Sequence, residues 1–218
     1  QFRKAEQIAP LAIPVEEPEL MNETEFYKNT DNVYSLLTVE PLEIEFGYSL
    51  LPLIDEKQGG SFIDRLVMVR KQFAVDYGMV IPPIRLHDNA SLAPNEYAIK
   101  IKGETIQIGE VLVDYYLALD SGNSEDDELE GIDTVDPAFG LPAKWITEEQ
   151  RDAAMINGYT VIDPLSVIVT HLSHVIKLYA HELLGRKEVG MILDNVKKTN
   201  KAVVEDIVPA VISIADLQ

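Results

Sequence analysis

Strict alternation of apolar and polar residues first appears at Leu42–Phe46, which predicts a half-buried strand. A second apolar run follows at 50–54. Ser61 and Asp64 fit a capping box at a helix start, and Gly78 fits the end of that helix. One face of the predicted helix is apolar at spacings of three and four residues: Phe62, Leu66, Val69, Phe73 and Tyr77.

The next patterns are those of strands. Residues 81–86 include two prolines and predict an extended segment at a sheet edge. Residues 97–101 and 105–108 predict a hairpin, and residues 111–119 predict another strand. The order β-α-β-β-β indicates a mixed α/β unit.

After a polar, acidic stretch at 121–130, the pattern predicts a strand at 143–146. Thr147 and Gln150 then fit the start of a helix that Gly158 ends. No internal repeat occurs along the chain.

Asp163 followed by Pro164 is a strong helix start and predicts a helix that continues to Leu184, where Gly185 stops it. Its apolar face is Leu165, Ile168, Leu172, Val175, Tyr179 and Leu183.

Two further helices are predicted at 187–197 and 201–208, with Thr199 placed to cap the second. Ser213 marks another helix start only a few residues before Gln218, so we expect the chain to be part of something longer.

Residues 1–40 have the composition of a tether, with three prolines and an acidic cluster at 16–19. Residues 19–27 allow a short helix with aromatic contacts. A disordered arm and an arm that docks on a neighbour both remain open.

Composition narrows the function classes. The 218 residues allow one good core or two or three small ones, and no apolar run reaches membrane-spanning length. The absence of cysteine removes disulfides, thiolate metal sites and cysteine nucleophiles. A formal net charge of −19 argues against nucleic-acid binding, which needs Lys and Arg to neutralise phosphates.

Candidate chemistry is sparse. His171 and His174 are neighbours on the predicted helix, but His181 lies nearly two turns further on, so no single metal ion reaches all three. The acidic stretch from Asp126 has Pro137 where a calcium loop needs its bidentate Glu. No phosphate-binding or nucleophile-elbow motif occurs. We therefore expect no catalytic residue, no metal and no cofactor, and interpret the protein as a non-enzyme.

Phe139 lies in a stiffened segment between Pro137 and Pro142, with Gly140 beside it. Such a segment can present an aromatic ring as an interface anchor. The residues alone favour the plainer interpretation, a loop aromatic folded into the local core.

Several ordered motifs resemble the cytoplasmic region of the FHIPEP family, whose members form export gates of flagella and of type III secretion systems. Gly47–Asp55 resembles the family's opening strand motif. The resemblance covers the chain from Pro41 onward, and its other motifs are 73–78, 82–89, 97–103, DPAFGLPAKWI (136–146), GYTVIDPLSVIVTHL (158–172) and ELLGRKE (182–188).

The resemblance implies an α/β (α+β) protein of several subdomains. It implies an acidic linker at 1–40 and a thioredoxin-like subdomain made of 41–114 and 163–184. A ferredoxin-like subdomain would be inserted at 115–162. The start of a helical third subdomain would occupy 185–218.

The family's docking site for chaperones lies between its first two subdomains. By resemblance, its Asp and Phe correspond to Asp136 and Phe139, and its Thr to Thr170. Ile162 and Val167 are expected to line the same pocket. Phe139 would then be the binding anchor, with Asp136 and Thr170 as its polar rim.

The implied function is a docking platform of the flagellar type III export apparatus on the cytoplasmic face of the bacterial cell membrane. Its partners would be flagellar export chaperones carrying late flagellar subunits, soluble export components, and copies of itself in a nine-membered ring. The alternative is a ring-forming segment of a virulence-type secretion gate that lacks this chaperone site.

Overall fold

We describe the fold from a computed structural model of the chain, which describes residues 26, 28–34, 37, 39–54, 61–120 and 129–218. The chain divides into two units, Gln1–Thr38 and Val39–Gln218. In the first unit one short helix, α2 (Thr30–Tyr34), is described. Of the helix expected at 19–27 only Phe26 is described, so that expectation lies largely outside the described residues.

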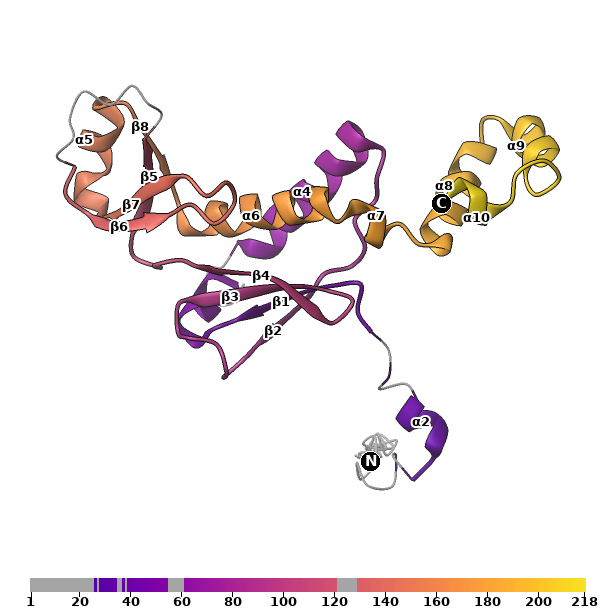
Figure 1. The fold of residues 1–218 in the computed structure, drawn as a ribbon, viewed down its shortest axis with the longest axis horizontal. Coiled ribbons are helices and arrows are strands. Elements are labelled where there is room, and N and C mark those ends of the chain that lie inside the picture. The colour runs from indigo at the N-terminus through magenta and orange to yellow at the C-terminus, as the bar shows by residue number, and fades with distance from the viewer. Residues whose placement is uncertain (1–25, 27, 35–36, 38, 55–60, 121–128) are drawn as a thin grey trace, which may run out of the picture. The chain divides into compact units, whose positions relative to one another are not determined.

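The first sheet of the second unit has the strand order β2-β1-β3-β4 (Figure 1). Its strands are β1 (Leu42–Phe46), β2 (Arg85–Asp88), β3 (Glu96–Ile101) and β4 (Glu104–Glu110). β1 and β2 are parallel, and the other pairs are antiparallel. The expected strand at 42–46 and the expected hairpin are therefore confirmed.

The strands of this sheet alternate between its two faces. Leu42, Ile44 and Phe46 are buried, and the Phe46 ring meets that of Phe62 edge-on at 5.5 Å. Glu45 points to the opposite face, where Lys100 Nζ lies 2.8 Å from its carboxylate. Burial raises the pKa of Glu45, but hydrogen bonds from Lys100, Asn89 and His87 outweigh it and hold the pKa below its usual value.

Helix α4 (Phe62–Tyr77) packs its predicted apolar face into the core, except that Tyr77 is exposed. It ends as expected at Gly78, whose φ of 64° is easily adopted only without a side chain. The expected capping box at Ser61 is wrong. Ser61 has φ −112° and ψ 17° rather than an extended backbone, and its side chain caps nothing.

Residues 47–54 differ from the strand motif that the resemblance implied. They form a 3-10 turn, η2 (Tyr48–Leu50), and a short helix, α3 (Leu51–Ile54). Gly47 approaches the 93–94 backbone too closely for a side chain, because a Cβ there would lie 2.1 Å from the Ala93 carbonyl oxygen. The chain turns at this contact instead of continuing as a strand.

The second sheet has the order β6-β7-β5-β8, with all pairs antiparallel. Its strands are β5 (Tyr116–Asp120), β6 (Ile132–Val135), β7 (Pro142–Ile146) and β8 (Tyr159–Ile162). The strand expected at 111–119 begins only at Tyr116. The sequence pattern did not predict β6 or β8.

Helix α5 (Arg151–Ile156) follows a 3-10 turn, η4 (Glu148–Gln150), and covers one face of this sheet. The expected start is confirmed, because the Thr147 N–H donates to Gln150 Oε1 at 2.9 Å. Gly158 ends the segment with φ 86°.

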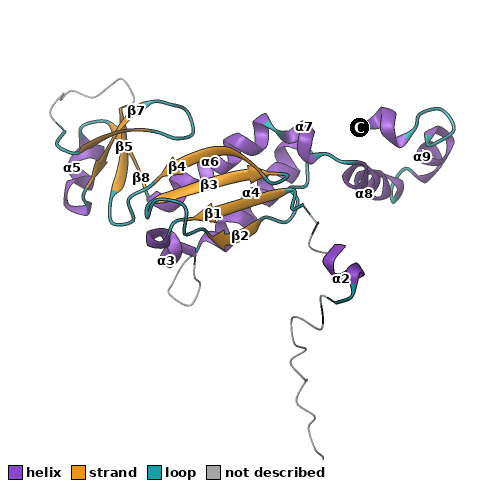
Figure 2. Cartoon of the chain, turned by 60° about the horizontal axis from the view of Figure 1, so that its bottom comes forward, coloured by secondary structure: helices purple, strands orange, loops and turns teal. Residues whose placement is uncertain are grey.

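Helix α6 (Pro164–Leu178) lies behind the first sheet in Figure 2, and its buried residues belong to a core that also includes residues of the second sheet. Its start is confirmed: Asp163 Oδ1 accepts the Ser166 N–H at 3.0 Å. The helix does not run unbroken to Leu184 as expected, because it ends at Leu178 and a separate turn, α7 (Ala180–Leu183), follows. The residues of the shared core that belong to the second sheet or to α6 are Leu117, Ala143, Trp145, Leu165, Val167, Ile168, Leu172, Val175 and Ile176.

The C-terminal part is helical, with α8 (Arg186–Lys197), α9 (Lys201–Ile207) and α10 (Ile214–Leu217). Thr199 does not cap α9: the N-cap is Asn200, and the Thr199 hydroxyl donates to the Val196 carbonyl. Ser213 does cap α10, as expected. Among the described residues, no helix has the length and apolarity needed to cross a membrane.

Candidate functional site

The loop between β6 and β7 is built around the buried carboxylate of Asp136. Its Oδ2 accepts the Phe139 N–H at 2.8 Å, and its carbonyl accepts the Gly140 N–H at 2.9 Å. The Asp136 N–H donates to the Leu141 carbonyl at 2.8 Å, which closes the loop. Gly140 takes φ 70°, a value that most side chains disfavour. The DPAFG sequence thus specifies a tight, internally hydrogen-bonded loop.

This loop presents the Phe139 ring to solvent. The residue is 59 % exposed, so the core interpretation that the residues alone favoured is wrong. One edge of the ring meets His174 of α6, with centroids 5.2 Å apart and planes at 74°. Such an edge-on aromatic contact orients the ring without burying it.

A second ring pair lies one turn earlier on α6. Tyr97 of β3 and His171 are both buried, and the Tyr97 hydroxyl and His171 Nδ1 are 2.8 Å apart. Burial lowers the pKa of His171 to about 4, although the charge of Asp136 opposes this shift. Burial, and then the charge of Asp136, raises the pKa of Tyr97. His171 is thus a buried histidine that is neutral at neutral pH.

Asp136 does not lie at the surface beside Phe139, where it was expected to form part of a polar rim. It is only 4 % exposed, so it forms no surface rim around Phe139. Its carboxylate faces inward, close enough to Tyr97 and His171 to influence both. Its role in the structure is to shape the loop that carries Phe139.

The other predicted site residues lie on or next to α6. Val167 is buried, Thr170 is half-buried, and Ile162 is a partly buried residue at the end of β8. Val167, Thr170, His171 and His174 follow one another at helical spacing along one face. The structure brings Phe139 into contact with this face at His174. Tyr97 and His174, which support the site, were not predicted as part of it.

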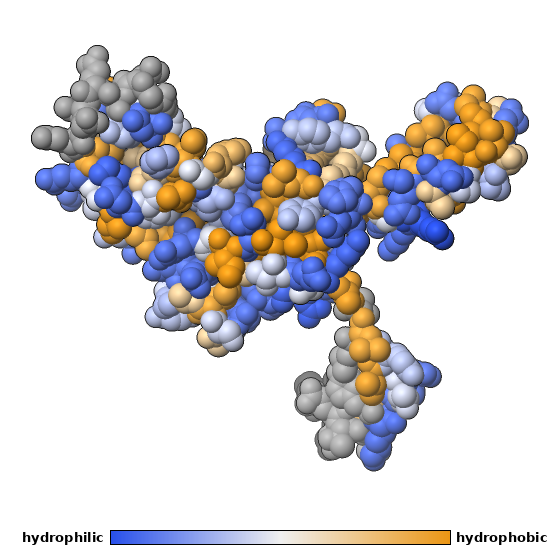
Figure 3. Space-filling view, viewed as in Figure 1, coloured by the Kyte–Doolittle hydropathy of each residue, from blue (hydrophilic) through white to orange (hydrophobic). Residues whose placement is uncertain are grey.

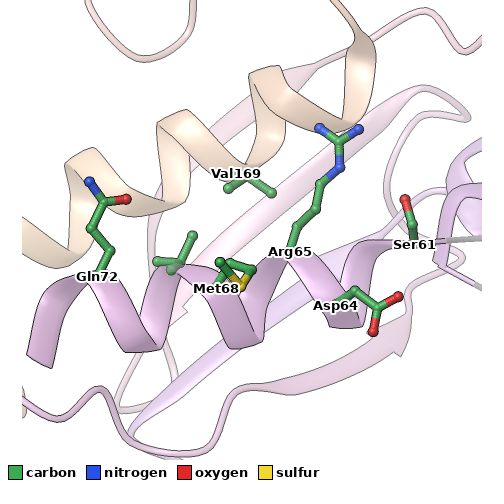
Figure 4. Close-up of a pocket in the computed structure, with 7 residues that line it drawn as sticks. Ser61, Asp64, Arg65, Met68, Gln72 and Val169 are labelled. Carbon is green, nitrogen blue, oxygen red and sulfur yellow. The ribbon is translucent and has the colours of Figure 1, made fainter.

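A separate shallow groove lies between α4 and α6 and has a volume of about 520 Å³ (Figure 4). None of the predicted site residues lines it; the lining residues are Ser61, Asp64, Arg65, Met68, Val69, Gln72 and Val169. Arg65 reaches from α4 to the start of α6, where its guanidinium lies 3.2 Å from the Asp163 carboxylate and also bonds the Ser166 hydroxyl. Burial raises the pKa of Asp163, but the hydrogen bonds from Ser166 and the charge of Arg65 outweigh it and lower the pKa overall.

In chemical terms, the site around Phe139 offers an exposed aromatic ring on a rigid support. The described residues contain no group of three or more His, Cys, Asp or Glu side chains placed to hold a metal ion. A rigid, exposed ring with a buried polar support is suited to protein–protein recognition.

Solved structures show which class of protein has this fold. The Chlamydia pneumoniae CdsV protein superposes with a TM-score of 0.68 at 24 % identity, covering 78 % of this chain and 54 % of that one. The EscV cytosolic domain from the type III secretion system gives a TM-score of 0.54 at 16 % identity, covering 78 % and 48 %. The chain therefore shares a mixed α+β fold with these two proteins, one of which is a cytosolic domain from a type III secretion system.

The chain belongs to the FHIPEP family, whose sequence pattern matches residues 4–218. It is 49 % identical over 196 residues to the flagellar biosynthesis protein FlhA of Bacillus subtilis, covering 90 % of the chain and 29 % of the relative. It is 39 % identical to FlhA of Escherichia coli K12, covering 82 % and 26 %. The chain thus spans less than a third of the length of these relatives.

Proposed function

We propose that this chain is a docking platform of the flagellar type III export apparatus, where chaperones deliver late flagellar subunits. The observation that carries the proposal is the exposed Phe139 ring, which meets the His174 ring and whose backbone N–H is bonded by the buried Asp136 carboxylate. An apolar ring held in a fixed orientation loses little conformational entropy on binding. Membership of a family of flagellar proteins supports the same function.

The docking surface comprises Phe139 and Thr170, with Val167 and Ile162 behind them. Asp136 acts from within by fixing the Phe139 loop. The site acts by binding and not by catalysis, and it needs no cofactor.

The proposed subdomains follow the resemblance. The first, thioredoxin-like subdomain comprises 41–114 and 163–184; the first sheet with α4 and α6 supports it. The second, ferredoxin-like subdomain comprises 115–162, supported by the second sheet with α5. Residues 185–218 begin a helical third subdomain, and residues 1–40 form the linker.

The proposed setting is the cytoplasmic face of the bacterial membrane, in a ring of nine copies of the full-length protein. Support comes from two structures of the same fold, nonameric EPEC SctV-C and the nonameric EscV cytosolic domain. A complex of CdsV with CdsO supports soluble export components as partners. The flagellar function is preferred to a virulence-type gate because the relatives at 37–49 % identity carry flagellar names, whereas these solved structures share the fold at 24 % identity or less.

The test is Phe139→Ala, measured for both binding and folding. Loss of a central aromatic anchor should weaken binding of a flagellar chaperone–substrate complex by about thirtyfold, equivalent to ~2 kcal/mol. The melting temperature should barely change, because the ring is mostly exposed. Calorimetric titration and thermal unfolding measure the two quantities.

The matched control is Ile156→Ala, which removes a side chain of α5 that is 85 % exposed and lies outside the site. It should leave binding unchanged. Unaltered binding by Phe139→Ala, or an equal loss in both variants, would rule out the proposed site.

A further inference from the structure

Strand β6, directly before the Phe139 loop, is a terminal strand of the second sheet. The pairing of β6 with β7 continues to Asp136 and Leu141, where the Asp136 N–H donates a hydrogen bond to the Leu141 carbonyl. Because hydrogen-bonded and non-hydrogen-bonded pairs alternate, Thr134 and Ile132 also bond inward. The N–H and C=O groups of Asp133 and Val135 therefore point away from β7, to an edge that no described strand pairs with. Pro142 lacks an N–H and is paired with Val135. This agrees with the register, because the Val135–Pro142 pair is one that exchanges no hydrogen bonds.

The side chains along this edge are unusually apolar for an exposed strand. Ile132 and Val135 are 51 % and 59 % exposed, and Leu141 lies exposed at the end of the same hairpin. Proline, lysine and bulges usually protect such edges, and β6 contains neither proline nor lysine. Terminal strand β4 differs, because Ile108 is its only large apolar residue exposed to this extent. Figure 3, viewed as in Figure 1, shows orange apolar surface among blue over the region of the second sheet.

The charge around the hairpin indicates what kind of chain the edge would accept. Residues 129–150 contain four exposed acidic residues, Glu130, Asp133, Glu148 and Glu149, and one basic residue, Lys144. Asp133 pairs with Lys144 at 3.0 Å, yet its side chain is still 88 % exposed. An approaching strand would therefore meet a predominantly negative surface and should itself be basic.

We propose that β6 binds an extended basic peptide segment of the docked complex, which adds to the second sheet as a fifth strand beside Phe139. This inference rests on the proposed function and extends it by naming a second contact. Backbone pairing to Asp133 and Val135 supplies affinity, as in other strand-addition complexes. Side chains supply selectivity: apolar residues lie beside Ile132 and Val135, and Lys or Arg lies beside Asp133.

The decisive variants are Val135→Pro and Val135→Ala. Both lose the valine side chain, but only proline removes the outward N–H, and the inward ladder stays intact. Val135→Pro should bind the chaperone–substrate complex about tenfold more weakly than Val135→Ala, the loss expected from one or two strand–strand hydrogen bonds. Amide hydrogen exchange on the wild-type chain should show Asp133 and Val135 protected only when the complex is present.

Equal binding by the two variants, or no added protection of these two amides, would overturn the inference. Protection that grows with the chain's own concentration would also overturn it, because the occupant would then be a second copy. If Phe139→Ala weakens binding while the two Val135 variants bind equally, only the strand inference fails.

If the wild-type chain binds no chaperone complex, the proposed function fails. The strand inference can then still be tested with a short peptide. A short amidated peptide of alternating Val and Lys should shift the Asp133 and Val135 amide resonances. The same peptide N-methylated at alternate residues should not. Equal shifts from both peptides would mean that charge alone attracts them and would overturn the inference.

Discussion

At the scale of single residues, Gly109 and Tyr97 fit closely together. The two residues face each other across β3 and β4, and the tyrosine ring lies over the glycine. A Cβ on Gly109 would come within 2.4 Å of the Tyr97 ring and hydroxyl. The ring has little freedom to move aside, because it is fully buried and its hydroxyl is bonded to His171.

We therefore predict that Gly109→Ala destabilises the fold by about 1–3 kcal/mol, the usual cost of overpacking a core. Urea unfolding followed by Trp145 fluorescence measures this change. The matched control is Gly190→Ala in α8, where a new Cβ meets nothing within 4 Å. This control should stabilise the helix slightly, since alanine has the higher helix propensity. Equal effects of the two substitutions would refute the argument from space.

The sequence predicted part of the site at this scale. Resemblance selected Asp136, Phe139 and Thr170 before any geometry was known, and their roles await the binding test. The exposure of Phe139 and the burial of Asp136 could not be predicted, because a stiff loop can turn either side chain inward. Tyr97 is separated from His171 by 74 positions, so no local pattern could reveal that hydrogen bond.

At the scale of elements, signals that depend on neighbouring residues were reliable. Asp163 and Thr147 start helices where the sequence predicts them, and Gly78 ends one. Ser61 shows the limit of such signals, because its backbone departs from the conformation that a capping side chain needs. β6 and β8 were missed because each has only four residues, too few for an alternating pattern to stand out.

A prediction for a whole element concerns Asp163, which caps α6 and forms an ion pair with Arg65 of α4. Asp163→Ala should cost about 1–2 kcal/mol at neutral pH, the usual worth of such a cap. Asp163→Asn should lose less, since an amide oxygen can still accept the Ser166 N–H. Chemical denaturation of the three proteins measures these differences.

The cost of Asp163→Ala should also depend on pH. The folded-state pKa of Asp163 lies below the usual value of a free aspartate. The charged carboxylate therefore contributes its stability above that value, and the contribution is lost as pH falls through the folded-state pKa. The gap between wild type and Asp163→Ala should narrow over that acidic range. A gap that stays constant down to the acid transition would show that the charge of Asp163 is unimportant.

At the scale of the whole molecule, the two sheets of the second unit share a core through α6, while the surface carries a large excess of acid. The chain has 37 acidic and 18 basic residues, so most carboxylates cannot pair with a cation. Ion pairs such as Lys197 with Glu205 and Arg85 with Glu40 lie at the surface and are worth little individually. Repulsion among unpaired carboxylates should therefore outweigh attraction within pairs.

This balance predicts the response to salt. Raising NaCl from about 20 mM to about 500 mM shortens the Debye length from roughly 20 Å to roughly 4 Å and screens both kinds of interaction. Because repulsion dominates at a net charge of −19, the melting temperature at pH 7 should rise with salt. Sodium chloride tests this better than sulfate, which also strengthens apolar burial. A melting temperature that falls with NaCl would mean that the ion pairs contribute more than the repulsion they offset.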